Sequence, residues 1–209
     1  MARLTRSQLL YDGCYAHIIS RSMQKRAIFM DTEDFVIFRE LLLEAKQAAG
    51  FRIFHYCLMG THFHLAVKIP DVVKFSRGLQ KLKSQYVYKF HAKYSFSGPV
   101  WRERFRSLLI EDEAYLYACG QYIENNPVKA DLVPNSDQWE YSSTRHYLGK
   151  TKDLLVDGYE EDLPLLPSQI NLQDGRFFED GIGIGSDFFR FKLTDKFKQI
   201  RPLAIVQTN

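Results

Sequence analysis

The sequence lacks several features that would assign it to common classes of protein. No apolar run approaches the roughly 20 residues that a membrane-spanning helix needs. The first ten residues include two arginines but no long apolar block or small-residue cleavage site, unlike a secretory signal. The three cysteines, Cys14, Cys57 and Cys119, form no C-x-x-C pair, which argues against a disulfide framework or a zinc knuckle. We therefore expect a cytoplasmic protein with no membrane partner and with buried, structural cysteines.

Internal repeats and low-complexity tracts are also missing. The glycine-rich segment 181–186 has no Gly-Lys-Ser/Thr ending and follows no convincing strand, so we do not interpret it as a phosphate loop. We expect a flexible turn there, with Ser186 capping a helix over residues 187–198. Hydrophobic residues make up 45% of the 209 residues, which is enough for one substantial core.

Acidic residues are nearly absent from one long window. Between Lys74 and Arg106 there are nine basic residues and one acidic residue, Glu103, a net charge of +8 in a chain whose total is +3. Ordinary solvated helices mix both signs, so a one-sided window indicates contact with a phosphate backbone. The candidates for binding nucleic acid are Lys81, Lys83, Arg102, Arg104 and Arg106.

A histidine pair stands out in the segment 62–69, which alternates with the period of a strand. His62 and His64 should therefore point to the same face, and Phe63 and Leu65 to the other. Two imidazoles side by side can bind a divalent metal, but an ion needs three or more ligands, so the spacing alone favours a half-exposed strand with one histidine bonded to a carbonyl and the other solvated.

The predicted elements are those of an α+β fold. Strands are expected over 14–20, 51–58, 62–69 and 100–110, and helices from Asp31 to near Gly50, from Pro70 to about Tyr94, and over 114–126, before Pro127. The order β-α-β-β-α-β-α is that of a ferredoxin-like antiparallel sheet with helices on one face. The other face would be open and would carry the site. A short helix is expected within 141–148, and the rest of the chain is less regular.

The third predicted helix carries a second informative motif. Its end reads Tyr122-Ile123-Glu124-Asn125-Asn126-Pro127-Val128-Lys129-Ala130. Tyr122 and Asn126 are one helical turn apart and share a face. A tyrosine there can act as a nucleophile while an amide oxygen binds a metal. Tyr115 and Tyr117 precede it on the same helix, and spacing does not exclude them.

Taken together, these motifs resemble those of the single-tyrosine HUH transposases, most closely the REP-associated tyrosine transposases. The likeness spans about residues 11–150 and includes the stretches Cys57-Leu58-Met59, Gly98–Ser107 and Trp139–Ser143. It differs at Gly60-Thr61, where the family more often has Pro-Asn, and at Glu124-Asn125. We therefore expect a catalytic domain over residues 1–150 and a partly helical extension over 151–209 that contacts DNA or packs on the domain.

The resemblance implies an activity and a role for each residue. Tyr122 would attack a phosphodiester in single-stranded or hairpin DNA, leaving a 5′-phosphotyrosine and a 3′-OH that can be rejoined. His62, His64 and Asn126 would hold a divalent metal, Mg²⁺ or Mn²⁺, and Lys129 would contact DNA beside the tyrosine. The protein would act in the bacterial cytoplasm at the nucleoid, as a monomer or a homodimer.

Two other functions compete with this one. The chain could be a catalytically idle, ferredoxin-like DNA-binding protein derived from a transposase, although a pure binder needs none of His62, His64, Tyr122 and Asn126. Alternatively it could be a metal hydrolase that uses water with Glu124 as the base, which would leave no covalent adduct.

Overall fold

The computed structural model describes residues 10–159, 171–172, 174–180 and 183–200. Its strands are β1 (Cys14–Arg21), β2 (Arg52–Met59), β3 (His62–Ile69), β4 (Arg106–Ile110) and β5 (Gly183–Ile184). Its helices are α1 (Thr32–Ala49), α2 (Val72–Tyr94), α3 (Glu113–Glu124), α4 (Asn126–Lys129), α5 (Thr144–Tyr147), α6 (Gly175–Glu179) and α7 (Asp187–Ile200), with short 3₁₀ turns at Met23–Lys25 and Ser136–Gln138.

The strands form one mixed sheet in the order β2-β3-β1-β4-β5. The first four are antiparallel to their neighbours, whereas β5 pairs in parallel with β4. The α+β class and the ferredoxin-like core that the sequence predicted are thus confirmed. The predicted turn at Gly183–Ile184 is instead a fifth strand, because these residues pair with the edge of β4 at Leu109 and Ile110.

The long helices begin and end where their capping residues predict. Asp31 accepts a hydrogen bond from the backbone of Asp34, whose side chain bonds back to Asp31, and Gly50 ends α1 with a positive φ of 70°. The Asp71 side chain caps α2 by accepting a hydrogen bond from the backbone of Lys74, and Asp112 caps α3 by accepting one from the backbone of Tyr115. Pro127 does not end the helical region altogether, because it fits the first turn of the short α4.

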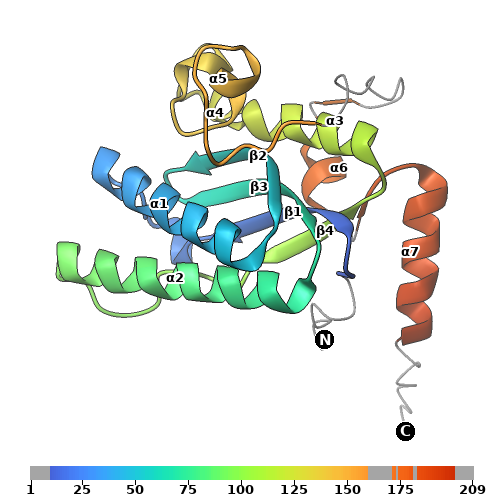
Figure 1. Cartoon of the computed structure of the whole chain (residues 1–209), viewed down its shortest axis with the longest axis horizontal. Coiled ribbons are helices and arrows are strands. Elements are labelled where there is room, and N and C mark those ends of the chain that lie inside the picture. The colour runs from blue at the N-terminus through green and yellow to red at the C-terminus, as the bar shows by residue number, and fades with distance from the viewer. Residues whose placement is uncertain (1–9, 160–170, 173, 181–182, 201–209) are drawn as a thin grey trace, which may run out of the picture.

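Two hydrophobic cores lie on opposite faces of the sheet. Helices α1 and α2 cover one face, where they pack on apolar side chains of β2 and β3 such as Phe63 and Leu65. Helix α3 lies across the other face, and the short α6 lies beneath it (Figure 1). The expectation that this second face is open is therefore wrong: a smaller core, including Ile19, Cys57 and Tyr122, fills it.

A glycine allows the close packing of α3 on the sheet. A Cβ atom on Gly120 would approach the ring of His55, on β2, to between 2.2 and 2.3 Å, so no larger residue fits without movement.

The fourth strand is shorter than expected. Residues 101–105 form bends rather than a strand, apart from a bridge between Ser22 and Trp101. The alternation of arginines suggested a strand over 100–110, but only residues 106–110, of which the last three are apolar, pair with β1.

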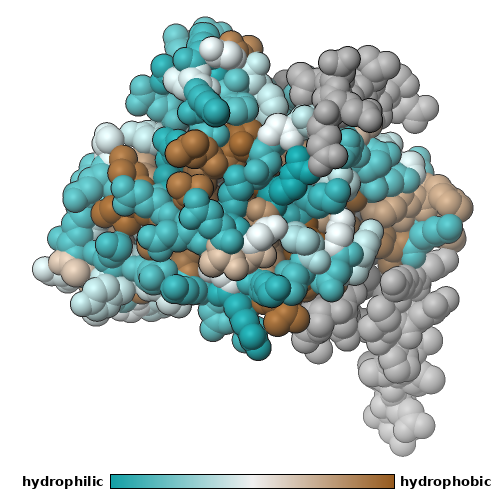
Figure 2. Space-filling view, in the orientation of Figure 1, coloured by the Kyte–Doolittle hydropathy of each residue, from teal (hydrophilic) through white to brown (hydrophobic). Residues whose placement is uncertain are grey.

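The chain after residue 150 returns to the body of the protein. Leu155 and Val156 are buried in the core beneath α1, and Phe178 is fully buried in the core beneath α3. Helix α7 extends along one side of the molecule (Figure 1). Most of the face seen in Figure 2 is hydrophilic, with hydrophobic groups in small patches. Within the described ranges, no helix is long and apolar enough to cross a membrane.

Candidate active site

The histidine pair lies on the face of the sheet that α3 covers. In the antiparallel register His62 is opposite Arg21 and His64 is opposite Ile19, both on β1. The two rings are neighbours, with centroids 4.9 Å apart. Their common face is the one that strand alternation predicted. His62 is partly exposed, whereas His64 is fully buried.

His64 is oriented by a chain of hydrogen bonds that ends on the C-terminal extension. Nδ1 of His17 lies 2.8 Å from the carbonyl oxygen of Phe178, and Nε2 of His17 lies 2.9 Å from Nδ1 of His64. Because a carbonyl can only accept, His17 donates from Nδ1 and, when neutral, accepts at Nε2. His64 then donates from Nδ1, which leaves a lone pair on its Nε2. That buried nitrogen has no hydrogen-bond partner among the described residues.

Burial keeps these imidazoles neutral near pH 7. Loss of solvation lowers the pKa of His17 to about 4 and that of His62 to about 4. Loss of solvation, with His62, His17 and Arg21 nearby, places the pKa of His64 well below its usual range. Neutral imidazole is the form that binds metal ions, so the low pKa values favour coordination over ion pairing.

Tyr122, on α3, points toward the same place. Its side chain is buried against the ring of Phe178, with centroids 4.5 Å apart, and lies edge-on to His17. The phenol donates a 2.8 Å hydrogen bond to Oε1 of Glu179. Burial, together with the negative charge of Glu179, raises the pKa of Tyr122 well above its usual value. The phenol is therefore fully protonated in this arrangement.

Glu179 joins the tyrosine to the histidines. The oxygen that accepts from Tyr122 lies 4.0 Å from Nε2 of His64, and the other carboxylate oxygen is paired with Arg21. The contact with His64 is not an ion pair, since the imidazole is neutral. Tyr122, His64 and Arg21, from α3, β3 and β1, thus converge on one carboxylate at the end of α6.

Asn126 and Lys129 both lie beside Tyr122. The amide nitrogen of Asn126 donates to the backbone carbonyls of Tyr122 and Ile123, at 3.0 and 3.1 Å, so its oxygen is the atom left for coordination. The ammonium of Lys129 lies 4.0 Å from the centre of the Tyr122 ring and donates to the carbonyl of Leu172. Loss of solvation lowers the pKa of Lys129. Lys129 therefore packs on the tyrosine in this structure.

Glu124 belongs to a different network. Its Oε1 accepts a hydrogen bond from the hydroxyl of Ser143 at 2.6 Å and lies 2.8 Å from Nδ1 of His55. The other nitrogen of His55 contacts the hydroxyl of Tyr159. These contacts hold α3 and the residues before α5 to β2. They occupy the carboxylate in a structural role, which weighs against Glu124 as the base of a hydrolase.

Two of the predicted arginines border the histidine site. Arg106 lies opposite Ile19, which in turn lies opposite His64, so the three share one row across the same face of the sheet. Arg106 also approaches Asp180 at 3.6 Å. The backbone of Arg102 bonds to the carbonyl of Arg21, and its side chain is exposed. The basic segment thus leads to the edge of the site.

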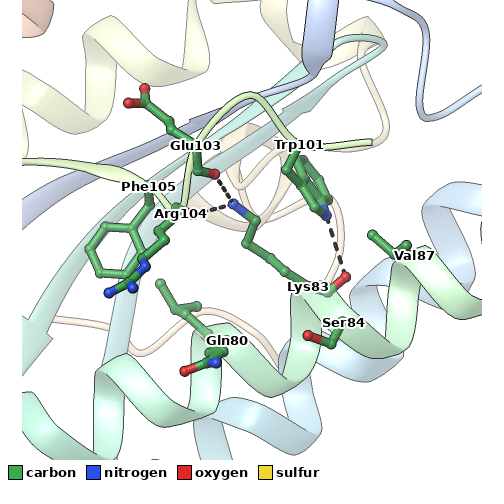
Figure 3. A pocket seen from close by; sticks show the side chains of 9 residues that line it. Gln80, Lys83, Ser84, Val87, Trp101, Glu103, Arg104 and Phe105 are labelled. Atoms are coloured by element: carbon green, nitrogen blue, oxygen red, sulfur yellow. Dashed lines mark hydrogen bonds between the residues drawn. The ribbon is translucent and has the colours of Figure 1, made fainter. Parts of the chain in front are cut away.

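Lys83 does not fit its predicted role in this conformation. Its side chain is buried, and the ammonium donates to Ser20 and to the carbonyls of Glu103 and Arg104. It also lies 4.7 Å from the centre of the Trp101 ring. Figure 3 shows it reaching from α2 to the segment 101–105. Lys83 therefore fixes that segment, and its charge is directed inward rather than toward a DNA strand.

A cavity of about 390 Å³ lies where this segment meets α2, and Figure 3 shows the side chains around it. Leu79, Val87 and Phe105 supply apolar walls. The side chain of Arg104 is exposed beside the cavity. Lys81, on α2, is also exposed but does not line the cavity. An exposed cation next to an apolar hollow is compatible with nucleic acid, whose backbone is charged and whose bases are flat and apolar.

The site suits an open metal centre rather than a closed one. Within the described part of the chain, no three His, Cys, Asp or Glu side chains form a group that could by itself hold a metal ion. However, His64 presents a buried, unpartnered lone pair beside a second imidazole and a carboxylate. A divalent ion bound there would therefore depend on water and phosphate oxygens to complete its shell.

Sequence reasoning missed His17, Arg21, Phe178 and Glu179. His17 could have been found, because residues 15, 17 and 19 of the predicted first strand share a face, and that strand neighbours the histidine strand in the predicted fold. Arg21 lies one residue beyond the predicted end of that strand, which in the structure includes it. No local signal pointed to Phe178 or Glu179, which are more than 50 residues from Tyr122 and follow an irregular segment.

Comparison with known proteins agrees with this architecture. A sequence model of the family "Transposase IS200 like" matches residues 10–126. A structure of a REP-associated tyrosine transposase bound to a REP hairpin has a TM-score of 0.60 and 18% identity, covering 77% of this chain and 100% of that one. A protein described as a transposase from Deinococcus radiodurans R1 has a TM-score of 0.37 and 16% identity over 60% of this chain and 97% of that one. No curated protein sequence matches the chain.

The matched region covers more than half of the sequence and includes the histidine strand and the tyrosine helix. The chain therefore belongs to the IS200-like transposase family. The first structural neighbour independently shows the fold.

Proposed function

We propose that this protein cleaves and rejoins single-stranded or hairpin DNA through a covalent bond to Tyr122. The observation that carries the proposal is the convergence of Tyr122 and His64 on the same carboxylate oxygen, at 2.8 and 4.0 Å. A tyrosine with only a packing role has no need to share a partner with an unsatisfied histidine. Family membership supports the same interpretation.

In the proposed reaction the phenol oxygen of Tyr122 attacks the phosphorus. A bond from Tyr122 to phosphorus forms as the bond from phosphorus to the 3′ oxygen breaks. The phenol gives up its proton and the 3′ oxygen gains one, so the products are a 5′-phosphotyrosine and a 3′-OH. Because one phosphate ester replaces another, the step is reversible and consumes no nucleotide cofactor.

His62, His64 and Asn126 are the residues that we propose hold Mg²⁺ or Mn²⁺. When bound, the ion would polarise the scissile phosphate and neutralise charge that develops on it. The residues of the chain do the rest. His17 orients His64 through their shared hydrogen bond, and the packing of Tyr122 on Phe178 restricts its ring.

The substrate would approach along the basic segment. We propose that Arg102, Arg104, Arg106 and Lys81 contact phosphates, with Lys129 beside the tyrosine. The backbone of Arg102 bonds to Arg21, and Arg106 lies opposite Ile19, which in turn lies opposite His64. The first structural neighbour is bound to a REP hairpin, which makes hairpin-bearing DNA the first substrate to test here.

A single experiment tests the proposal. The protein is incubated with end-labelled, hairpin-bearing single strands and Mn²⁺ or Mg²⁺, and the products are separated on denaturing gels. We expect a shorter strand with a 3′-OH and a protein–DNA adduct that protease digestion removes. A chelator should abolish both products. Cleavage without any adduct would favour a hydrolase that uses water, and DNA binding without cleavage would favour an idle binding protein.

A further inference from the structure

We propose that Glu179 is a further protein ligand of the divalent ion, through the carboxylate oxygen that lies 4.0 Å from Nε2 of His64. The proposal rests on the function proposed above, and it assigns to the C-terminal extension a direct part in the site. Neither the histidine motif nor the tyrosine motif includes this residue.

The first argument is the direction of the lone pairs. The carbonyl of Phe178 requires His17 to donate from Nδ1, and this leads to a lone pair on Nε2 of His64. A carboxylate oxygen of Glu179 lies 4.0 Å from that nitrogen. Two electron-rich atoms face each other, and the buried nitrogen finds no donor among the described residues. Burying such a nitrogen without a partner is costly, and a cation between the two atoms would satisfy both.

The second argument is size. Mg²⁺ would bind each ligand at about 2.0–2.1 Å, so two ligands of one ion would lie no more than about 4 Å apart. The separation between Nε2 of His64 and the carboxylate oxygen of Glu179 is 4.0 Å. A direct hydrogen bond would need a distance close to 3 Å, and the two atoms are too far apart for one.

The third argument is charge. Two neutral imidazoles and one amide would offer Mg²⁺ no negative charge, although this ion prefers carboxylate and other hard oxygen ligands. Glu179 supplies the missing charge. Its other oxygen is held by Arg21, and Tyr122 donates to the oxygen that faces His64. The carboxylate is therefore already oriented toward the histidine.

The fourth argument is that consecutive residues serve the same site. The carbonyl of Phe178 orients His64 through His17, and the side chain of the next residue faces the resulting lone pair. The end of α6 thus orients one ligand and supplies another. A carboxylate with only a packing role would not need this relation to His64.

Binding of Mn²⁺ tests the proposal without any need for catalysis. Free Mn²⁺ is measured by its paramagnetic resonance signal during titration of the full-length protein. Four variants are compared with the wild type: Glu179→Gln, Asp180→Asn, Tyr122→Phe and His64→Ala. Asp180→Asn is the matched control, because it removes the same charge from the neighbouring residue, which pairs with Arg106 instead.

We expect Glu179→Gln to bind Mn²⁺ at least about tenfold more weakly, since even indirect partners of a metal are worth that much. Asp180→Asn should stay within about twofold of the wild type, and His64→Ala should lose most binding. Tyr122→Phe breaks the hydrogen bond to Glu179 but leaves the carboxylate, so its Mn²⁺ affinity should be retained. A loss in Tyr122→Phe as large as that in Glu179→Gln would mean that Glu179 only holds α6 in place, and would overturn the proposal.

The outcomes separate this proposal from the proposed function. If Glu179→Gln binds Mn²⁺ as tightly as the wild type while His64→Ala does not, Glu179 is no ligand, and the proposed function still stands. If the variants bind Mn²⁺ as expected but the wild type forms no adduct with hairpin DNA, the proposed DNA-joining function is wrong, and Glu179 is still a metal ligand. Thermal melting of each variant confirms that the comparison is made between folded proteins.

Discussion

The two faces of the sheet differ in what they bury. Beneath α1 and α2 the side chains are almost all apolar, and aromatic rings such as Phe38, Phe63 and Tyr86 pack on one another. Beneath α3 and α6 the buried groups include His17 and His64, which are joined in a hydrogen-bonded chain. His64 and Phe63 are neighbours on one strand, yet they face these different environments.

The difference assigns separate tasks to the two faces. Apolar packing needs no specific partner atoms and tolerates exchange of one aliphatic group for another. Buried imidazoles need a partner for each nitrogen, and among the described residues one nitrogen, Nε2 of His64, remains without one. Stability should therefore depend mainly on the first face and chemistry on the second. The following experiments test that division, from the largest expected effect to the smallest.

Tyr122→Phe should abolish the covalent adduct and cleavage, because it removes the nucleophilic oxygen while the ring still packs on Phe178. The loss of one hydrogen bond should change the free energy of unfolding by only about 1 kcal/mol. Gel assays for the adduct, with chemical denaturation for stability, measure both quantities. DNA affinity should be nearly unchanged.

Glu124→Gln is the comparison for that experiment. Its carboxylate is engaged with His55 and Ser143, so cleavage should persist in this variant. Cleavage that survives in Tyr122→Phe and disappears in Glu124→Gln would instead identify a water-using hydrolase.

His64→Ala should also eliminate nearly all cleavage, by a different route. It removes a proposed metal ligand and leaves Tyr122 in place, so a large excess of Mn²⁺ should restore a trace of adduct. Single-turnover cleavage at increasing Mn²⁺ concentration measures this rescue. Full activity of His64→Ala at ordinary Mn²⁺ concentration would contradict the metal site altogether.

Phe38→Ala addresses the opposite face. The side chain is fully buried among Phe29, Phe63 and Tyr86, so its removal should lower the free energy of unfolding by about 3–5 kcal/mol. Well below the melting temperature, the rate of cleavage per folded molecule should stay near that of the wild type. A rate that falls in proportion to stability would show that the two faces are not independent.

Lys83→Met tests whether this lysine is structural. The variant keeps the length of the side chain but leaves Ser20 and two carbonyls without their donor, which should cost about 2–4 kcal/mol of stability. DNA affinity should fall only as far as the segment 101–105 loses order. Unchanged stability with a large drop in affinity would restore Lys83 to the DNA-contacting set.

Arg104→Gln should have the smallest effect. Loss of one phosphate contact should weaken binding to all DNA sequences alike and reduce the slope of log affinity against log salt by about one unit. Titration by fluorescence anisotropy at several salt concentrations gives the slope. A weaker affinity for one hairpin only, with an unchanged slope, would indicate a base contact.

Much of the fold could be predicted because its signals are local. The limits of the strand His62–Ile69 and the end of α1 at Gly50 followed from alternation and from a residue that tolerates a positive φ. The common face of His62 and His64 followed from the same alternation. The placement of Tyr122 near them depended on the resemblance to a family, since helical spacing could not separate it from Tyr115 and Tyr117.

The rest could not be predicted because it depends on contacts between distant segments. A lysine in the basic part of a helix is expected to face solvent. Lys83 is buried only because the segment 101–105 lies against α2 and supplies carbonyl acceptors. The polar chain through His17 ends on Phe178, 161 residues away in sequence. The glycine-rich sequence suggested a turn at Gly183–Ile184. In the structure these residues instead form a short strand, because they pair with the edge of β4.

The hydrogen bond from His17 to Phe178 has a consequence for protein synthesis. A ribosome makes the histidine strand and the tyrosine helix well before it makes α6. Until α6 emerges, the nascent chain carries His62, His64 and Tyr122, yet the carbonyl that sets the orientation of His64 and the carboxylate of Glu179 are still missing. The order of translation therefore delays completion of the site until after residue 179 has left the ribosome, so a nascent or prematurely terminated chain would hold an incomplete site near any DNA it met.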